Sequence, residues 1–167
     1  MEYVKRIIDD EISEQLKVCG AVQIRGPKWC GKTTSAKQQA KSVLEMQNPD
    51  LQSNYIELAN TKPSLLLQGD KPRLIDEWQV APVLWNAVRY SVDSSGLFGE
   101  YILTGSATPK DFSNLHSGVG RFANIDMKPM SLYESGDSNG KISLQELMNG
   151  NKNIDGIKTD LTYEKIA

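Results

Sequence analysis

Eight residues near the start of the chain carry the strongest chemical signal in the sequence. The string GPKWCGKT, residues 26–33, matches the phosphate-binding pattern G-x-x-x-x-G-K-[ST] at every fixed position. Its two glycines allow successive backbone N–H groups to point inward at phosphate oxygens. We expect Lys32 to reach the β- and γ-phosphates of a nucleotide and the Thr33 hydroxyl to bind Mg²⁺. The residues predicted to bind the nucleotide are Gly26, Pro27, Lys28, Trp29, Cys30, Gly31, Lys32, Thr33 and Thr34.

A second acidic motif follows the loop lysine by 44 residues, as Leu74-Ile75-Asp76-Glu77. An apolar strand that ends in an aspartate is the Walker B pattern, and Asp76 is predicted to hold Mg²⁺ through water, because this ion dehydrates reluctantly. Glu77 is predicted to orient a water for attack on the γ-phosphorus, which favours hydrolysis over transfer to another acceptor. The alternative is an exposed acidic pair at the end of a strand.

Two further positions are candidates for contact with the transferred phosphate. Thr104 and Ser106 end the next strand in hydroxyls, and either can sense the γ-phosphate or merely cap a loop. Arg121, at the entry to the last strand, is a candidate arginine finger that acts across a subunit interface. An ordinary surface arginine is an equally good interpretation. The predicted catalytic residues are therefore Glu77, Lys32, Thr104 and Arg121, and the predicted metal ligands are Thr33 and Asp76.

The base of the nucleotide is predicted to be adenine. A GTPase would have D-x-x-G after its second motif, whereas here Gln79 stands three residues after Asp76. The string at 151–155, NKNID, has one residue too many for a guanine-reading N-K-x-D. The predicted cofactors are therefore ATP and Mg²⁺.

Composition excludes several other classes of protein. The 167 residues carry a formal net charge of -2, so a nucleic-acid-binding face is not indicated. No apolar run is long enough to span a membrane and no signal-peptide core is visible, which predicts a cytoplasmic location. Trp78, Trp85 and Tyr90 invite a base-stacking role, but their helical spacing favours packing in the core.

These residues need a scaffold, and the apolar patterning predicts one. We expect strands at 21–24, 55–59, 73–76, 101–104 and 122–127, and helices at 3–17, 33–47, 82–92 and 143–148. Alternating strands and helices imply a parallel sheet covered on both faces, with ligands bound beyond the carboxyl ends of the strands. The predicted fold is an α/β three-layer P-loop NTPase sandwich with a five-stranded, mainly parallel sheet and a short helical C-terminal extension.

Four strings in this order carry a family resemblance: GPKWCGKTT, LIDEWQVAPVLWNAVRYSVD, YILTGSATP and HSGVGRF…MKPMSLYESG. Over residues 3–147 the chain resembles a bacterial and archaeal AAA-type ATP-binding protein family. The resemblance implies the AAA-like sheet order, a catalytic Glu77, and Mg²⁺ and sensor roles for Asp76 and Thr104. Members usually continue into a further C-terminal domain. We therefore expect an ATPase core at 1–135, with the helix at 3–17 packed on it, and a linker and the start of a lid or next domain at 136–167.

Together these observations predict an Mg²⁺-dependent ATPase that couples hydrolysis to a conformational change in an attached domain or partner. The alternatives are an ATP-binding switch or scaffold with negligible turnover, and a small-molecule kinase of the P-loop type. Expected partners are ATP and ADP, a second copy of the chain through Arg121, and a C-terminal domain or protein partner whose identity the sequence does not give.

Overall fold

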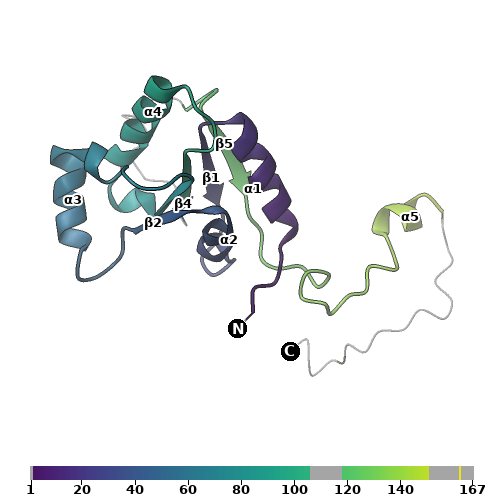
Figure 1. Cartoon of the computed structure of the whole chain (residues 1–167). Coiled ribbons are helices and arrows are strands. Elements are labelled where there is room, and N and C mark those ends of the chain that lie inside the picture. The colour runs from purple at the N-terminus through teal and green to yellow at the C-terminus, as the bar shows by residue number, and fades with distance from the viewer. Residues whose placement is uncertain (1, 106–117, 151–161, 163–167) are drawn as a thin grey trace. The chain divides into compact units, whose positions relative to one another are not determined.

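The computed structural model describes residues 2–105, 118–150 and 162 (Figure 1). The chain divides into two units, Ile7–Pro129 and Met1–Arg6 together with Met130–Ala167. The domain boundary expected at residue 135 stays a prediction. Within the described residues, none of the helices is long and apolar enough to cross a membrane.

The larger unit is built on a sheet in which every described pair of neighbouring strands is parallel. The strands are β1 (Ala21–Arg25), β2 (Ser42–Glu45), β3 (Arg73–Asp76), β4 (Tyr101–Gly105) and β5 (Phe122–Asp126), in the spatial order β2-β3-β4-β1-β5. All their carboxyl ends therefore lie at one edge of the sheet, and all their amino ends lie at the other.

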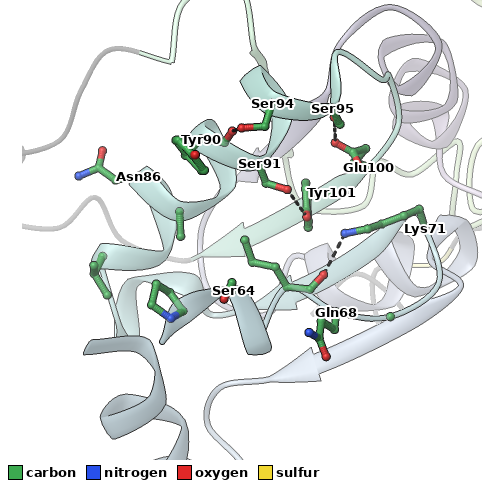
Figure 2. Close-up of a pocket in the computed structure, with 15 residues that line it drawn as sticks. Ser64, Gln68, Lys71, Asn86, Tyr90, Ser91, Ser94, Ser95, Glu100 and Tyr101 are labelled. Carbon is green, nitrogen blue, oxygen red and sulfur yellow. Dashed lines mark hydrogen bonds between the residues drawn. The ribbon is translucent and has the colours of Figure 1, made fainter. Parts of the chain in front are cut away.

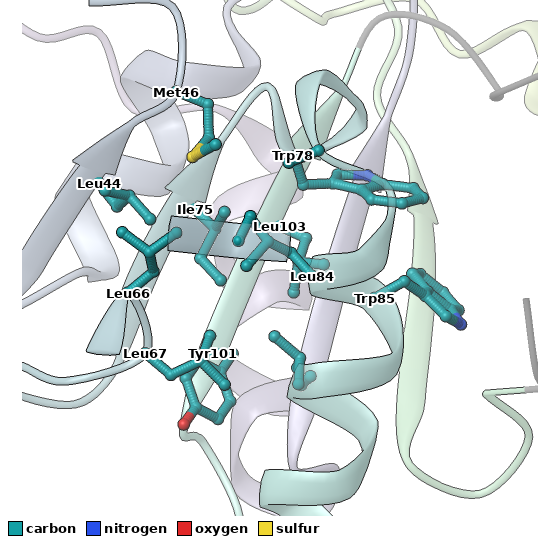
Figure 3. Packing of buried hydrophobic residues seen from close by; sticks show 14 of the residues in the cluster. Leu44, Met46, Leu66, Leu67, Ile75, Trp78, Leu84, Trp85, Tyr101 and Leu103 are labelled. Carbon is teal, nitrogen blue, oxygen red and sulfur yellow. The ribbon is translucent and has the colours of Figure 1, made fainter. Parts of the chain in front are cut away.

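Helices cover both faces of this sheet, which gives the expected three layers (Figure 1). One face carries α1 (Ile7–Val18) and α2 (Lys32–Gln39), and the other carries α3 (Gln52–Thr61) and α4 (Val83–Ser95) with the short 3-10 turns η1 (Pro63–Leu65) and η2 (Trp78–Val80). The cause is alternation along the strands: Ile102 packs on the α1 side, whereas Tyr101 and Leu103 pack on the α4 side. Figure 3 shows the core between the sheet and α4, with Ile75, Leu103 and Leu84 at its centre.

The predicted helix at 33–47 is too long, and the predicted strand at 55–59 is wrong. The helix ends at Gln39, and Ser42–Glu45 forms β2 beside β3, because Val43 and Leu44 fit a pleated strand and Leu44 is buried. The apolar run at 55–59 lies in α3, where Tyr55, Leu58 and Ala59 share one helical face against the core. The number of strands is as predicted, but the identity of one is not.

Smaller differences concern the first helix and the aromatic residues. The first helix begins at Ile7 rather than at residue 3. Trp78 and Trp85 are buried as expected, with ring centroids 5.2 Å apart. Tyr90, on α4, is not buried: 71% of the residue is exposed. In the smaller unit, α5 (Leu144–Met148) forms the predicted short helix.

Candidate nucleotide-binding site

The glycine loop joins β1 to α2 at the carboxyl edge of the sheet, where the motif requires it. Its backbone has positive φ at Gly26 (155°), Trp29 (67°) and Gly31 (98°), so it turns in a way that ordinary residues rarely follow. A Cβ at Gly26 would lie 2.3 Å from the backbone oxygen of Met127. Trp29 adopts the left-handed conformation with its side chain 99% exposed. The loop backbone therefore passes so close to the residue after β5 that only a glycine fits at position 26.

Lys32, the first residue of α2, lies inside the loop that precedes it. Only 5% of the residue is exposed, and its ammonium donates to the backbone oxygens of Gly26 at 3.0 Å and Pro27 at 2.7 Å. These two bonds fold the side chain back under the loop, so its charge is surrounded by loop backbone. The phosphate contacts expected of Lys32 stay a prediction.

Asp76, at the end of β3, accepts hydrogen bonds from two hydroxyls on one carboxylate oxygen. Thr33 Oγ1 donates to Asp76 Oδ1 at 2.6 Å, and Thr104 Oγ1 donates to the same atom at 2.5 Å. The parallel register explains the second bond, because Asp76 lies directly opposite Thr104 in the β3–β4 pair. Residues distant in sequence thus meet at one carboxylate oxygen, and the metal and sensor roles expected of them stay predictions. Ser106, the alternative to Thr104, lies outside the described residues.

A hydroxyl next to a carboxylate is a donor set that suits a hard cation such as Mg²⁺, which takes few protein ligands and keeps several waters. Thr33 and Asp76 supply this pair. Among the residues that the structure describes there is no cluster of three histidine, cysteine or acidic side chains. The pair of Thr33 and Asp76 fits the predicted ion.

Glu77 follows Asp76 in an unusual backbone conformation, with φ of 56° and ψ of 48°. Such a conformation is uncommon in a glutamate and is found preferentially at functional sites. Its carboxylate accepts a hydrogen bond from the Gln79 side-chain amide. The other end of that amide lies against Gly105, since a Cβ at Gly105 would approach Gln79 Oε1 to 2.4 Å. Gln79 therefore fixes the glutamate side chain relative to the end of β4.

A pocket of about 670 Å³ opens beside these groups. It is lined by Lys28, Trp29, Gly31, Lys32, Thr33, Thr34, Gln47, Glu77 and Gln79. The sequence interpretation missed Gln47, because that residue had been assigned to the end of a helix rather than to the segment after β2. It also missed a role for Gln79, whose position depends on the turn at Glu77 and has no motif of its own.

Arg121 does not lie with the other candidates in its own chain. It precedes β5, at the amino edge of the sheet, whereas the loop lies at the carboxyl edge. Its Nε donates to Asp93 Oδ1 of α4 at 2.6 Å. A finger role for Arg121 therefore requires a second copy of the chain, and it stays a prediction.

A parallel sheet in the order β2-β3-β4-β1-β5, with a glycine loop between β1 and α2, defines the fold of a P-loop nucleoside triphosphatase. The model of the AAA domain family matches residues 19–136, and the chain belongs to this family. This family membership assigns the chain a P-loop ATPase core of the AAA type, in agreement with the resemblance noted in the sequence.

Among solved structures, one match is PCH-2 from C. elegans, with a TM-score of 0.43 and 17% sequence identity. The match covers 83% of this chain and 46% of the PCH-2 chain, so it spans less than half of that protein. No curated protein matches the sequence.

Proposed function

We propose that this chain binds ATP with Mg²⁺ and hydrolyses it, and that the energy drives a conformational change in an attached domain or partner. The observation that carries the proposal is the meeting of Thr33, Asp76 and Thr104 beside a loop that already encloses Lys32. Four groups from three segments of the chain, with complementary roles in phosphate chemistry, converge at the carboxyl edge of a parallel sheet.

In this proposal each group has a separate role. The loop amides and the amino end of α2 hold the phosphates, and Lys32 exchanges its bonds to the loop oxygens for bonds to the β- and γ-phosphates. Thr33 and Asp76 hold Mg²⁺, which offsets the negative charge of the phosphates. Glu77 accepts a proton from a water directed at the γ-phosphorus. Thr104 fixes the orientation of Asp76 and contacts the γ-phosphate end of the site.

A second candidate is an ATP-dependent switch with negligible turnover, and the bond between Gln79 and Glu77 favours it. A carboxylate oxygen that already accepts a hydrogen bond from Gln79 is occupied as an acceptor for the attacking water. On this view the glutamate is restrained until another domain or partner moves Gln79. The kinase alternative has no comparable observation in its favour.

Phosphate release from ATP separates these functions. We expect Glu77→Gln to lower the rate by at least about 100-fold, the usual contribution of a general base, while ATP binding is retained. Glu57→Gln is the matched control, because Glu57 is an exposed acid on α3. Wild-type release no faster than that of Glu77→Gln, with ATP still bound, would leave the switch as the function. Gln79→Ala is then expected to raise turnover.

Binding itself is tested by Lys32→Ala, with Lys62→Ala as a control at an exposed lysine. The loop variant should lose at least about tenfold in ATP affinity, because two charged phosphates lose a buried partner. Unchanged affinity would contradict the assignment of the loop.

The proposed assembly through Arg121 predicts that phosphate release per chain rises with protein concentration, and a constant rate would contradict it.

A further inference from the structure

A second pocket, of about 900 Å³, is shown in Figure 2. It lies in the same unit, at the opposite edge of the sheet from the candidate nucleotide site. It is bounded by η1, by the segment before β3, by α4 and by the start of β4. The amino ends of β3 and β4 therefore face it, whereas their carboxyl ends face the glycine loop. Its volume is that of an ordinary small-molecule site, and none of the nucleotide-binding candidates lines it.

Lys71 is the cation of this pocket. Its ammonium lies 3.5 Å from the centre of the Tyr101 ring and donates to the backbone oxygen of Leu67 at 3.0 Å (Figure 2). In the part of the chain that the structure describes, it forms no salt bridge with a carboxylate. Burial lowers the pKa of Lys71 to about 8; Glu100 partly opposes this effect and Arg73 adds to it. A partly desolvated ammonium whose neighbouring carboxylate, Glu100, forms no ion pair with it is costly, and a bound anion would offset that cost.

Further donors stand near Lys71. The hydroxyls of Ser91 and Tyr101 share a hydrogen bond of 2.8 Å, and whichever accepts it keeps its own O–H for another acceptor. The acid that lines the pocket, Glu100, is 8% exposed and accepts a hydrogen bond from Ser95 Oγ. Its charge is thus engaged by a donor of the protein and does not neutralise Lys71 directly.

The rest of the pocket offers apolar surface. Pro63 and Leu67 contribute on one side, and Val83 and Ala87 on the other. Tyr90 lies on α4 at the same pocket (Figure 2), and most of the residue is exposed. An exposed aromatic side chain beside a concave apolar surface indicates a binding site better than an isolated exposed aromatic does. A binding role would also explain why Tyr90 lies on the surface, although its helical spacing predicted a place in the core.

We propose that this pocket binds an organic carboxylate, whose carboxylate group pairs with Lys71 and the Ser91–Tyr101 hydroxyls and whose apolar body lies against Val83, Ala87 and Tyr90. This chemistry is common to a small carboxylic acid and to the C-terminus of a peptide with an apolar last residue. The inference does not depend on ATP hydrolysis, because no residue of the candidate nucleotide site takes part in it.

Calorimetric titration of the full chain tests the charge requirement. Octanoate is compared with octanamide, which has the same shape without the charge, and an acetylated peptide ending in leucine is compared with its C-terminal amide. We expect at least one carboxylate to bind and its amide to bind at least tenfold more weakly. Binding of octanoate indicates a small acid, and binding of the peptide alone indicates a chain terminus. Equal binding of acid and amide, or no binding of either acid at millimolar concentration, overturns the proposal.

Substitutions then test the role of Lys71 and of the pocket around it. Lys71→Met should lower carboxylate affinity at least tenfold, Lys71→Arg should stay within about threefold, and Lys62→Met, at an exposed lysine, should have no effect. Ser94→Trp, which fills the pocket from the exposed side of α4, should also prevent binding and serves if Lys71→Met does not fold. Full affinity in Lys71→Met or in Ser94→Trp contradicts the site.

Discussion

The half-buried ammonium of Lys71 should make the stability of the fold depend on pH in a predictable direction. Burial lowers its pKa from 10.5 to about 8 in the folded chain. Between these two values the unfolded chain binds more protons than the folded chain, so the free energy of unfolding rises as pH increases. Below pH 8 both states hold the proton, and the folded state carries the full cost of the desolvated charge.

The size of the effect follows from the two pKa values. For one group with pKa 10.5 unfolded and about 8 folded, the free energy of unfolding gains at most about 1.8 kcal/mol between pH 7.5 and 9.5. Lys71 is only partly buried, so solvent screening reduces the expected gain to about 1 kcal/mol. Tyr101, whose pKa is raised mainly by burial, titrates above this range and acts in the opposite direction.

Urea unfolding of the wild type, Lys71→Met and Lys62→Met at pH 7.5 and 9.5 measures this gain as a difference between variants. The contributions of the other titrating groups to the pH dependence are the same in both variants and largely cancel in that difference. The stability of the wild type relative to Lys71→Met should increase by about 1 kcal/mol over the range, while Lys62→Met follows the wild type. If the wild type and Lys71→Met respond to pH in parallel, the reasoning about a desolvated, unpaired ammonium is refuted.

Two substitutions test the geometry of the candidate nucleotide site. Gly26→Ala places a Cβ 2.3 Å from Met127 O at a φ of +155°, and the resulting strain should displace the loop. ATP affinity, measured by titration, should therefore fall at least about tenfold. Normal affinity would contradict the described loop. Thr104→Val removes a donor to Asp76 and should lower the free energy of unfolding by about 1–2 kcal/mol, visible as a melting temperature a few degrees lower. An unchanged melting temperature would show that Thr33 alone satisfies Asp76.

The parts of the site that sequence could predict are those in which residue type and spacing dictate backbone geometry. The loop between β1 and α2 is of this kind, because its glycines and lysine have one structural solution after a strand. The sequence placed Asp76 and Thr104 at the ends of two strands of one parallel sheet, and the register of β3 and β4 in the structure brings them into contact. Gln79 could not be predicted, since its contact with Glu77 depends on a left-handed glutamate that no local propensity favours.

The two errors in the fold have a common physical cause. Short apolar runs fit a strand and one face of a helix equally well, and tertiary packing decides between them. Residues 42–45 became a strand because β3 offered a free edge, and residues 55–59 became helical because one face of α3 could pack against the core. Tyr90 is a different kind of error: the helical period placed it correctly on α4, but the face it occupies borders a pocket.

Strand β4 connects the two proposed sites, with Tyr101 at one end in the carboxylate pocket and Thr104 at the other beside Asp76. Coupling between sites requires an element with two arrangements. All five residues of β4 are buried and the strand is bonded to neighbours on both sides, β3 and β1, so it has no room to shift. We therefore expect carboxylate affinity to change less than twofold when ATP and Mg²⁺ are added in the same calorimetric titration. A larger change would show that α4 or the segment before β3, rather than the strand, transmits a rearrangement between the two edges of the sheet.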